Sequence, residues 1–253
     1  MSSSGFYAAV TGLVSRTDAL DLVANNLANA NTTGYKAQKE FYRALTAAEN
    51  PNLTPLNKAI NDYGILGGAE TDLRSGSMEK TGNQLDIALE GSGFLTVQTP
   101  SGISYTRDGS FHLGPNGELL TADGGKVLAV PTDPKADPAP ITLPDGPVSI
   151  SADGTISSQG AVVAQLNLVD FPHGTQLTAQ GNSYFTAPQG AAQAATNVGV
   201  RQGSLEASNY NPVEGTVDLV TLQRQADLLN HALSIFDSSF AQAEAQDLPR
   251  IQP

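Results

Sequence analysis

The feature that most constrains the fold is a stripe of apolar residues at each end of the chain. Near the N-terminus these residues recur in alternating steps of four and three, the spacing of one helix face in a coiled coil. This first stripe consists of Phe6, Val10, Leu13, Leu20 and Leu27, with Thr17 and Ala24 at the remaining steps. The pattern predicts a long helix that needs a partner along this face.

The C-terminal segment repeats the pattern. Its stripe consists of Leu219, Leu222, Leu229, Leu233 and Phe236, with Ala226 and Phe240 completing the steps. The start of this helix is well marked, because Asn211 can cap it, Pro212 suits the first helical position and Glu214 can serve as a capping-box acid. Two long helices are therefore expected at the ends of the chain.

Both predicted helices also carry apolar residues off their stripes, including Val14 on the first and Leu228 and Ile235 on the second. A single partner would leave these side chains in water, where a continuous apolar face is unfavourable. This distribution favours assembly with other subunits.

The middle of the chain has the pattern of short β-strands. Apolar runs such as "LDIALEGSGFLTVQT" are bounded by Gly or Pro, and Asp-Gly and Asn-Gly pairs recur at hairpin-like intervals. We therefore predict an α+β fold, in which long N- and C-terminal helices pair as a coiled-coil-like unit and flank an all-β middle domain. The expected segments are helical at 1–35, extended and partly β at 36–84, β-rich at 85–207, and helical at 208–253.

Charge and composition exclude several classes of protein. The net charge of −12 argues against binding to nucleic acid or to an anionic membrane surface, since phosphates require basic residues. No run approaches the roughly 18–20 apolar residues of a membrane span, so no membrane insertion is expected. The chain contains 0 Cys, and its opening is a poor match to a cleaved secretory signal.

The sequence offers little support for an enzyme. His112, His173 and His231 fall on different predicted elements, and no nucleophile, zinc or phosphate-loop motif occurs. The Asp-Gly pairs lack the regular period of calcium-binding repeats, so we interpret them as hairpin turns. No catalytic residue, metal site or cofactor is expected.

Five blocks, in order, resemble the flagellar basal-body rod and hook proteins. They are "ANNLANANTTGYKAQ", "TGNQLDIALEGSGFLTV", "YTRDGSF", "NGELLTADGGKVL" and "GSLEASNYNPVE", and together they span almost the whole chain. Any one block alone would be weak, but their order is specific. Within the family, the opening "SGFYAAVTGL" is more like the proximal rod type, and the C-terminal helix departs from the distal type. A divergent distal subunit remains the alternative.

The resemblance implies a structural subunit of the bacterial flagellar rod without catalytic residues. It implies that the terminal helices pair in the inner wall of a tube and that the β-rich middle faces outward. It further implies partners among other rod proteins and copies of itself, export by the flagellar type III apparatus, and assembly in the periplasm.

The family signature at the end of the first helix contains Asn25, Asn26, Asn29, Thr33, Gly34 and Tyr35. Asn25 and Asn26 come too early to cap the helix, so we interpret them as hydrogen-bonding groups between subunits. Asn29 can serve either as a cap or as a contact, and Gly34 supplies a left-handed residue. On this interpretation, Asn26→Leu leaves the stability of the monomer nearly unchanged and impairs rod assembly.

Two interpretations compete with the rod subunit. One is a secreted, adhesin-like β protein whose end helices form a trimeric coiled coil with copies of the same chain only. The other is a hydrolase built on the β domain, for which the sequence offers no converging titratable residues.

Overall fold

The computed structural model describes residues 3–43, 65–131, 137–144, 146–172, 174–181 and 183–247. The chain divides into two compact units. The helical unit comprises residues 1–27, 38–70 and 212–253, and the β unit comprises residues 28–37 and 71–211. The predicted α+β class, with helices at both ends and strands between them, is confirmed.

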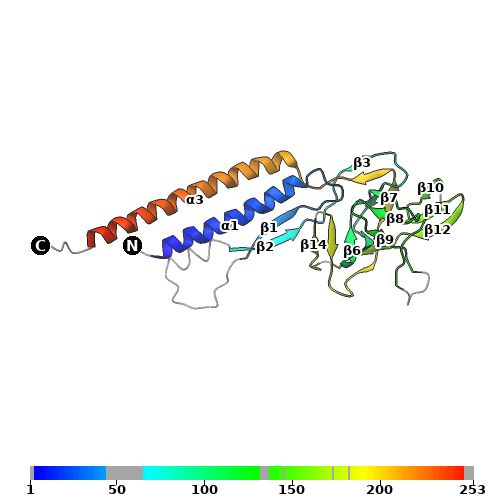
Figure 1. Ribbon diagram of the computed structural model, residues 1–253, viewed down its shortest axis with the longest axis horizontal. Helices are drawn as coiled ribbons and strands as arrows, with labels where there is room; N and C mark the ends of the chain where they lie inside the picture. The colour runs from blue at the N-terminus through cyan, green and yellow to red at the C-terminus, as the bar shows by residue number, and fades with distance from the viewer. Residues whose placement is uncertain are drawn as a thin grey trace. The chain divides into compact units, whose positions relative to one another are not determined.

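The helical unit contains two long helices, α1 (Ser3–Ala28) and α3 (Pro212–Asp247). They run along each other in opposite directions (Figure 1). A Cβ at Gly12 of α1 would lie 3.8 Å from a methyl group of Leu229 on α3, an ordinary packing distance. The predicted start of α3 at Pro212, with Glu214 in its first turn, is confirmed.

The segment expected to be extended and partly β contributes strands within its described residues. Strands β1 (Gln38–Arg43) and β2 (Ile65–Thr71) form a two-stranded sheet. Strand β3 (Met78–Lys80) pairs with β18 (Ser204–Glu206), so the beginning and the end of the β unit meet in one ladder.

The remaining strands of the β unit are short, as the frequent Gly-containing turns predict. They are β4 (Ile87–Glu90), β5 (Phe94–Thr99), β6 (Gly102–Thr106), β7 (Phe111–Leu113), β8 (Leu119–Thr121), β9 (Lys126–Val127), β10 (Val148–Ile150), β11 (Thr155–Ser158), β12 (Ala161–Gln165), β13 (Leu168–Asp170), β14 (Thr178–Gln180), β15 (Tyr184–Thr186), β16 (Gln193–Ala194) and β17 (Gly199–Gln202).

The largest sheet among the described residues is antiparallel and has the strand order β14-β15-β6-β5-β9-β8-β7, with β13 and β16 joined through β5. Strands β10, β11 and β12 form a separate three-stranded meander, and β17 pairs with β4 (Figure 1). Strand β5 is central, because it pairs with β6, β9 and β13.

The β unit has its own apolar core. The fully buried side chains are Ile87, Leu89, Leu95, Val97, Val127 and Ile156. A smaller aromatic cluster forms around Phe94, whose ring meets Phe171 and Phe185 edge to face. Neither described helix contains a stretch long and apolar enough to cross a membrane. The buried core allows the β unit to fold around its own residues.

Candidate assembly site

The predicted stripe of α3 lies on the partly covered face of that helix. Ala226 at its centre is buried, and Leu219, Leu222, Leu229 and Leu233 are half-buried around it. The side chain of Phe236, the last stripe residue, lies outside the described residues. These half-buried leucines still leave part of their apolar surface exposed to solvent.

On α1 the structure places the best-covered face beside the predicted stripe rather than on it. Ala19, Val23 and Asn26 are buried, at spacings of four and three. The predicted residues Val10, Leu13, Leu20 and Leu27 lie on the flank and are half-buried, whereas the side chain of Phe6 lies outside the described residues. The covered face contains Asn26, which bonds to Gln38 of β1, and Gly12, which packs near Leu229 of α3, so both β1 and α3 cover this side of α1.

A second apolar strip runs along the outer side of α3. Large fractions of its side chains are exposed to solvent: 72% for Val213, 62% for Val217, 42% for Val220, 70% for Leu228 and 53% for Ile235. Val14 of α1 is also 55% exposed. Single exposed apolar residues are common, but these five share one helix face over about six turns, with exposed Arg224 and His231 between them, which is typical of an interaction surface.

The other notable site is an ionic cluster inside the β unit, formed by Lys36, Arg107 and Glu206. One carboxylate oxygen of Glu206 lies 2.6 Å from Lys36 Nζ, and the other lies 3.1 Å from a terminal nitrogen of Arg107. All three residues are at most 2% exposed. The cluster joins the end of the α1 signature, the "YTRDGSF" block and the "GSLEASNYN" block, three parts of the sequence that resemble the rod and hook family.

Backbone carbonyls supply further hydrogen-bond partners for the two cations, although the buried Nε of Arg107 has none among the described residues. Lys36 Nζ donates to the Arg74 carbonyl at 2.8 Å, and the Arg107 guanidinium donates to the carbonyl of Gly91 at 2.6 Å. The guanidinium also lies over the Phe94 ring, 5.3 Å from its centre. Buried charges require such partners, because each has given up its hydration.

The cluster holds two positive charges against one negative charge. Burial lowers the pKa of Lys36 below its ordinary value, and nearby Arg107 acts in the same direction, while Glu206 opposes both. Removing the single carboxylate would leave two cations facing each other in a dry environment. Glu206 is therefore the residue on which the cluster depends most.

Gly34, a predicted signature residue, passes against the backbone of the "YTRDGSF" turn. Its φ is +66°, and a Cβ at this position would lie 2.3 Å from the Asp108 amide nitrogen. Next to it, the Thr33 hydroxyl donates to the Asp108 carboxylate at 2.8 Å. Only glycine fits this position, since it is both left-handed and in close backbone contact.

Tyr35 lies buried beside Lys36 and next to Tyr210. Burial, followed by the electrostatic influence of Tyr210, raises the pKa of Tyr35 to about 12. Its side chain is 4% exposed. Tyr35 is thus part of the packed interior of the β unit in this structure.

The structure differs from our expectation for Asn26. Its side chain is 2% exposed, and its amide donates to the Gln38 carbonyl at 2.7 Å and accepts from the Gln38 amide at 2.9 Å. The amide imitates a neighbouring strand and is used within the chain, so it does not project toward another subunit. The helix phase deduced from the leucines placed this residue on the wrong side.

The other two asparagines take different positions. Asn29 is buried just after α1, where its backbone carbonyl accepts from the Thr32 amide at 3.0 Å and its side chain accepts from the Thr32 hydroxyl at 3.2 Å. This corresponds to helix termination, one of the two roles expected for it. Asn25 is exposed, so a contact with another subunit remains a prediction for this residue.

Sequence reasoning missed the cluster itself. Lys36 belonged to the quoted signature without a role, and Arg107 lay in the quoted "YTRDGSF" block without an assigned partner. The structure pairs Arg107 with Glu206, 99 positions along the chain. Asp108 accepts from Thr33 and Ser110. The one available signal was the presence of Lys, Arg and Glu within three blocks of the family pattern.

Comparison with known proteins places these features in a family. Residues 6–36 match the flagella basal body rod protein model, and residues 88–164 match the flagellar hook protein FlgE/F/G D1 domain. The flagellar basal-body rod protein FlgF of Caulobacter vibrioides is 37% identical over 81% of this chain and 82% of its own length. The FlgF of Mesorhizobium japonicum is 32% identical over 86% of this chain and 87% of its own length.

The chain belongs to the flagellar basal-body rod protein family. The FlgG of Borreliella burgdorferi is also similar, with 31% identity over 92% of this chain and 94% of its own length. The chain is thus a structural subunit of the rod, a component of the bacterial flagellum that assembles with other rod components. The ionic cluster and Gly34 link the two regions that match the family models, because Lys36 lies in one and Arg107 in the other.

Proposed function

We propose that this chain is a proximal rod subunit that polymerises through its terminal helices. In this role it forms part of the drive shaft and of the wall of the export channel. Two points support the proximal type: the opening residues resemble it, and relatives at 37% and 32% identity carry the name FlgF.

The exposed apolar strip of α3 (Val213, Val217, Val220, Leu228 and Ile235) supports assembly through this helix. The partner helix α1 covers a different face of α3, the one centred on Ala226. Fully burying one Val, Leu or Ile side chain is worth about 1.5–3 kcal/mol, so covering the strip strongly favours association. Copies of this chain and other rod proteins are the partners we propose for it.

We also propose the export route and the purely structural role that the family resemblance implies. The chain would leave the cytoplasm through the flagellar export apparatus and assemble in the periplasm. It would act by mechanical connection, with no catalytic residue, no cofactor and no nucleic-acid partner. The net charge of −12 is consistent with the last point, since nucleic acid would be repelled.

A pair of charged substitutions tests the function. Val217→Asp and Leu228→Asp together place two carboxylates on the strip, and in cells lacking the native gene we expect no swimming and no completed rods. Val162→Asp is the matched control, because Val162 is 71% exposed on β12 of the β unit. Purified strip variants should keep wild-type melting temperatures. Normal swimming of the double variant would refute assembly through this face.

A distal rod subunit is the second candidate, favoured by the FlgG relative that covers 92% of this chain. Complementation separates the two. The proximal assignment predicts that the chain restores swimming to a strain lacking its FlgF gene and fails in a strain lacking its FlgG gene. The reverse pattern would assign the chain to the distal rod.

A further inference from the structure

Several chain connections between the helical unit and the β unit are tied together by one side chain. The chain passes between the units at residues 27/28, 37/38, 70/71 and 211/212. Asn209 lies two residues before the last of these passages, within the "GSLEASNYN" block. Its amide bonds to residues at two other passages, 37/38 and 70/71.

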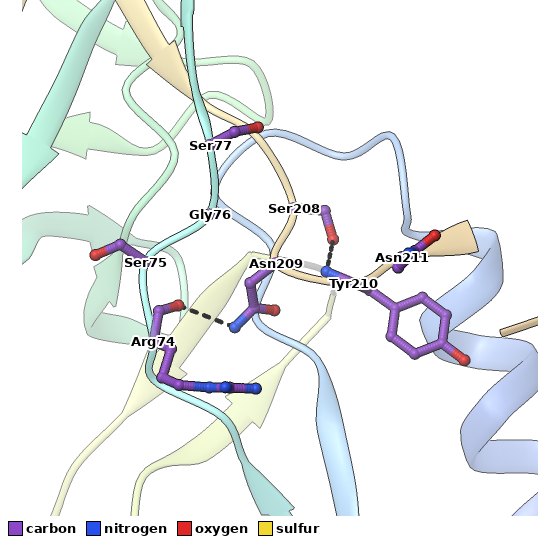
Figure 2. Close-up of a pocket in the computed structure, with 8 residues that line it drawn as sticks. All are labelled: Arg74, Ser75, Gly76, Ser77, Ser208, Asn209, Tyr210 and Asn211. Atoms are coloured by element: carbon purple, nitrogen blue, oxygen red, sulfur yellow. Dashed lines mark hydrogen bonds between the residues drawn. The ribbon is translucent and has the colours of Figure 1, made fainter. Parts of the chain in front are cut away.

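Each polar atom of the Asn209 amide is used. Oδ1 accepts from the Ala37 amide at 2.8 Å, and Nδ2 donates to the carbonyls of Asp72 at 2.7 Å and Arg74 at 2.9 Å. Figure 2 shows the bond to Arg74 at the edge of a shallow polar hollow of about 400 Å³, lined by residues 74–77 and 208–211. A primary amide can accept a hydrogen bond through its oxygen and donate two through its nitrogen. No other side chain of this size offers this combination.

The segments held by Asn209 are also bonded to each other. The Asp72 amide donates to the Ala37 carbonyl at 2.8 Å, so Ala37, Asp72 and Asn209 form a closed ring of hydrogen bonds. A further backbone bond joins the same two parts of the chain: the Gly34 amide donates to the Glu206 carbonyl at 2.8 Å. The chain ends that lead into β1 and α3, and the end that arrives from β2, are therefore fixed to one another.

We propose that Asn209 is a positioning residue for rod assembly, which holds three chain connections together where they leave the β unit. This inference rests on the proposed assembly through the terminal helices, because α3 begins directly after the segment that contains Asn209. Asn209 lies outside the apolar core of the β unit, so its loss should free the connections without unfolding the strands.

Amide exchange in the full-length chain tests the hydrogen bonds directly. In Asn209→Ala, we expect the Ala37 amide to exchange about tenfold faster, the loss expected for one hydrogen bond, while amides of the β5–β6 ladder keep wild-type rates. Asn116→Ala is the matched control, since Asn116 is an exposed turn residue of the same unit. An unchanged rate at Ala37, or faster exchange throughout β5 and β6, would overturn the proposal.

Swimming of cells that carry the same variants tests the consequence. Asn209→Ala should reduce the fraction of swimming cells at least tenfold, and Asn116→Ala should not. Asn209→Asp keeps the acceptor for Ala37 but has no N–H for Asp72 and Arg74, so it should protect Ala37 and still impair swimming. Normal swimming of both Asn209 variants would overturn the proposal. A different variant tests the proposed function itself. If assembly through the helices is wrong, the Val217→Asp/Leu228→Asp variant should swim normally, whatever the Asn209 variants do.

Discussion

Lys36 Nζ lies 2.6 Å from Oε1 of Glu206, although the two residues are 170 positions apart and neither side chain is exposed. The same carboxylate accepts from the Gly76 amide at 2.9 Å and from Arg107 at 3.1 Å. One side chain therefore connects the residues that follow α1, the segment before β3, the turn after β6 and the strand β18.

The ionic cluster predicts an order of destabilisation. Removing one partner of a buried ion pair costs about 3–5 kcal/mol, because it leaves the other charge uncompensated. Glu206→Gln leaves two buried cations and should lose more stability than Lys36→Met, which leaves Glu206 paired with Arg107. Lys80→Met, an exposed lysine on β3, should change the free energy of unfolding by less than about 0.5 kcal/mol. Urea denaturation measures all three, and an equal loss for Glu206→Gln and Lys80→Met would contradict the role of the cluster.

Asn26→Leu should now destabilise the isolated monomer, contrary to the expectation from sequence. The substitution leaves the amide and the carbonyl of Gln38 without the partners seen in the structure, at about 1–3 kcal/mol for each group that stays buried. Asn230→Leu, at an exposed position of α3, serves as the control and should leave the melting temperature close to that of the wild type. Equal melting temperatures for Asn26→Leu and wild type would show that the two hydrogen bonds contribute nothing to the monomer.

The pKa of Tyr35 predicts a loss of stability at alkaline pH. The unfolded phenol ionises near its ordinary pKa of 10.0, whereas the folded one keeps its proton up to about 12. Its stabilising contribution is thus complete below pH 10 and is lost as the pH rises through 12. The pKa of Lys36 is lowered from its ordinary value of 10.5. Below that value, its contribution to stability therefore increases as the pH rises, the opposite of the effect of Tyr35.

Tyr35→Phe isolates the contribution of this phenol. The variant should lose less stability than the wild type between pH 8 and pH 11, as measured by urea denaturation at each pH, because the titration of every other group is shared. Parallel loss in the two proteins would show that Tyr35 does not titrate differently in the folded and unfolded states.

Sequence patterns predicted the elements that depend on local spacing. The four-three repeat, together with Asn211 and Pro212, placed the start of α3 at the observed residue, and turn signals predicted the short strands of the middle. Such features are encoded by residues a few positions apart. They require no knowledge of which segments meet in space.

The remaining features depend on long-range pairing. Glu206 and Lys36 are each ordinary in their local sequence, and nothing local indicates that one neutralises the other. The phase of α1 could not be deduced either, because its buried face, with Ala19 and Val23, lies beside the leucines rather than on them. For the same reason, Asn26 was predicted to face outward and is buried.

We propose that neighbouring subunits cover the outer strip of α3 in the rod, and the reactivity of a cysteine introduced there measures whether they do. The chain contains 0 Cys, so Leu228→Cys introduces a single thiol at a position that is 70% exposed in the subunit. In the purified monomer we predict rapid labelling by a maleimide. In basal bodies isolated from swimming cells we predict at least tenfold slower labelling, with full reactivity restored when the rods are dissociated in detergent. Equal labelling rates in the monomer and in intact basal bodies would contradict assembly through this face.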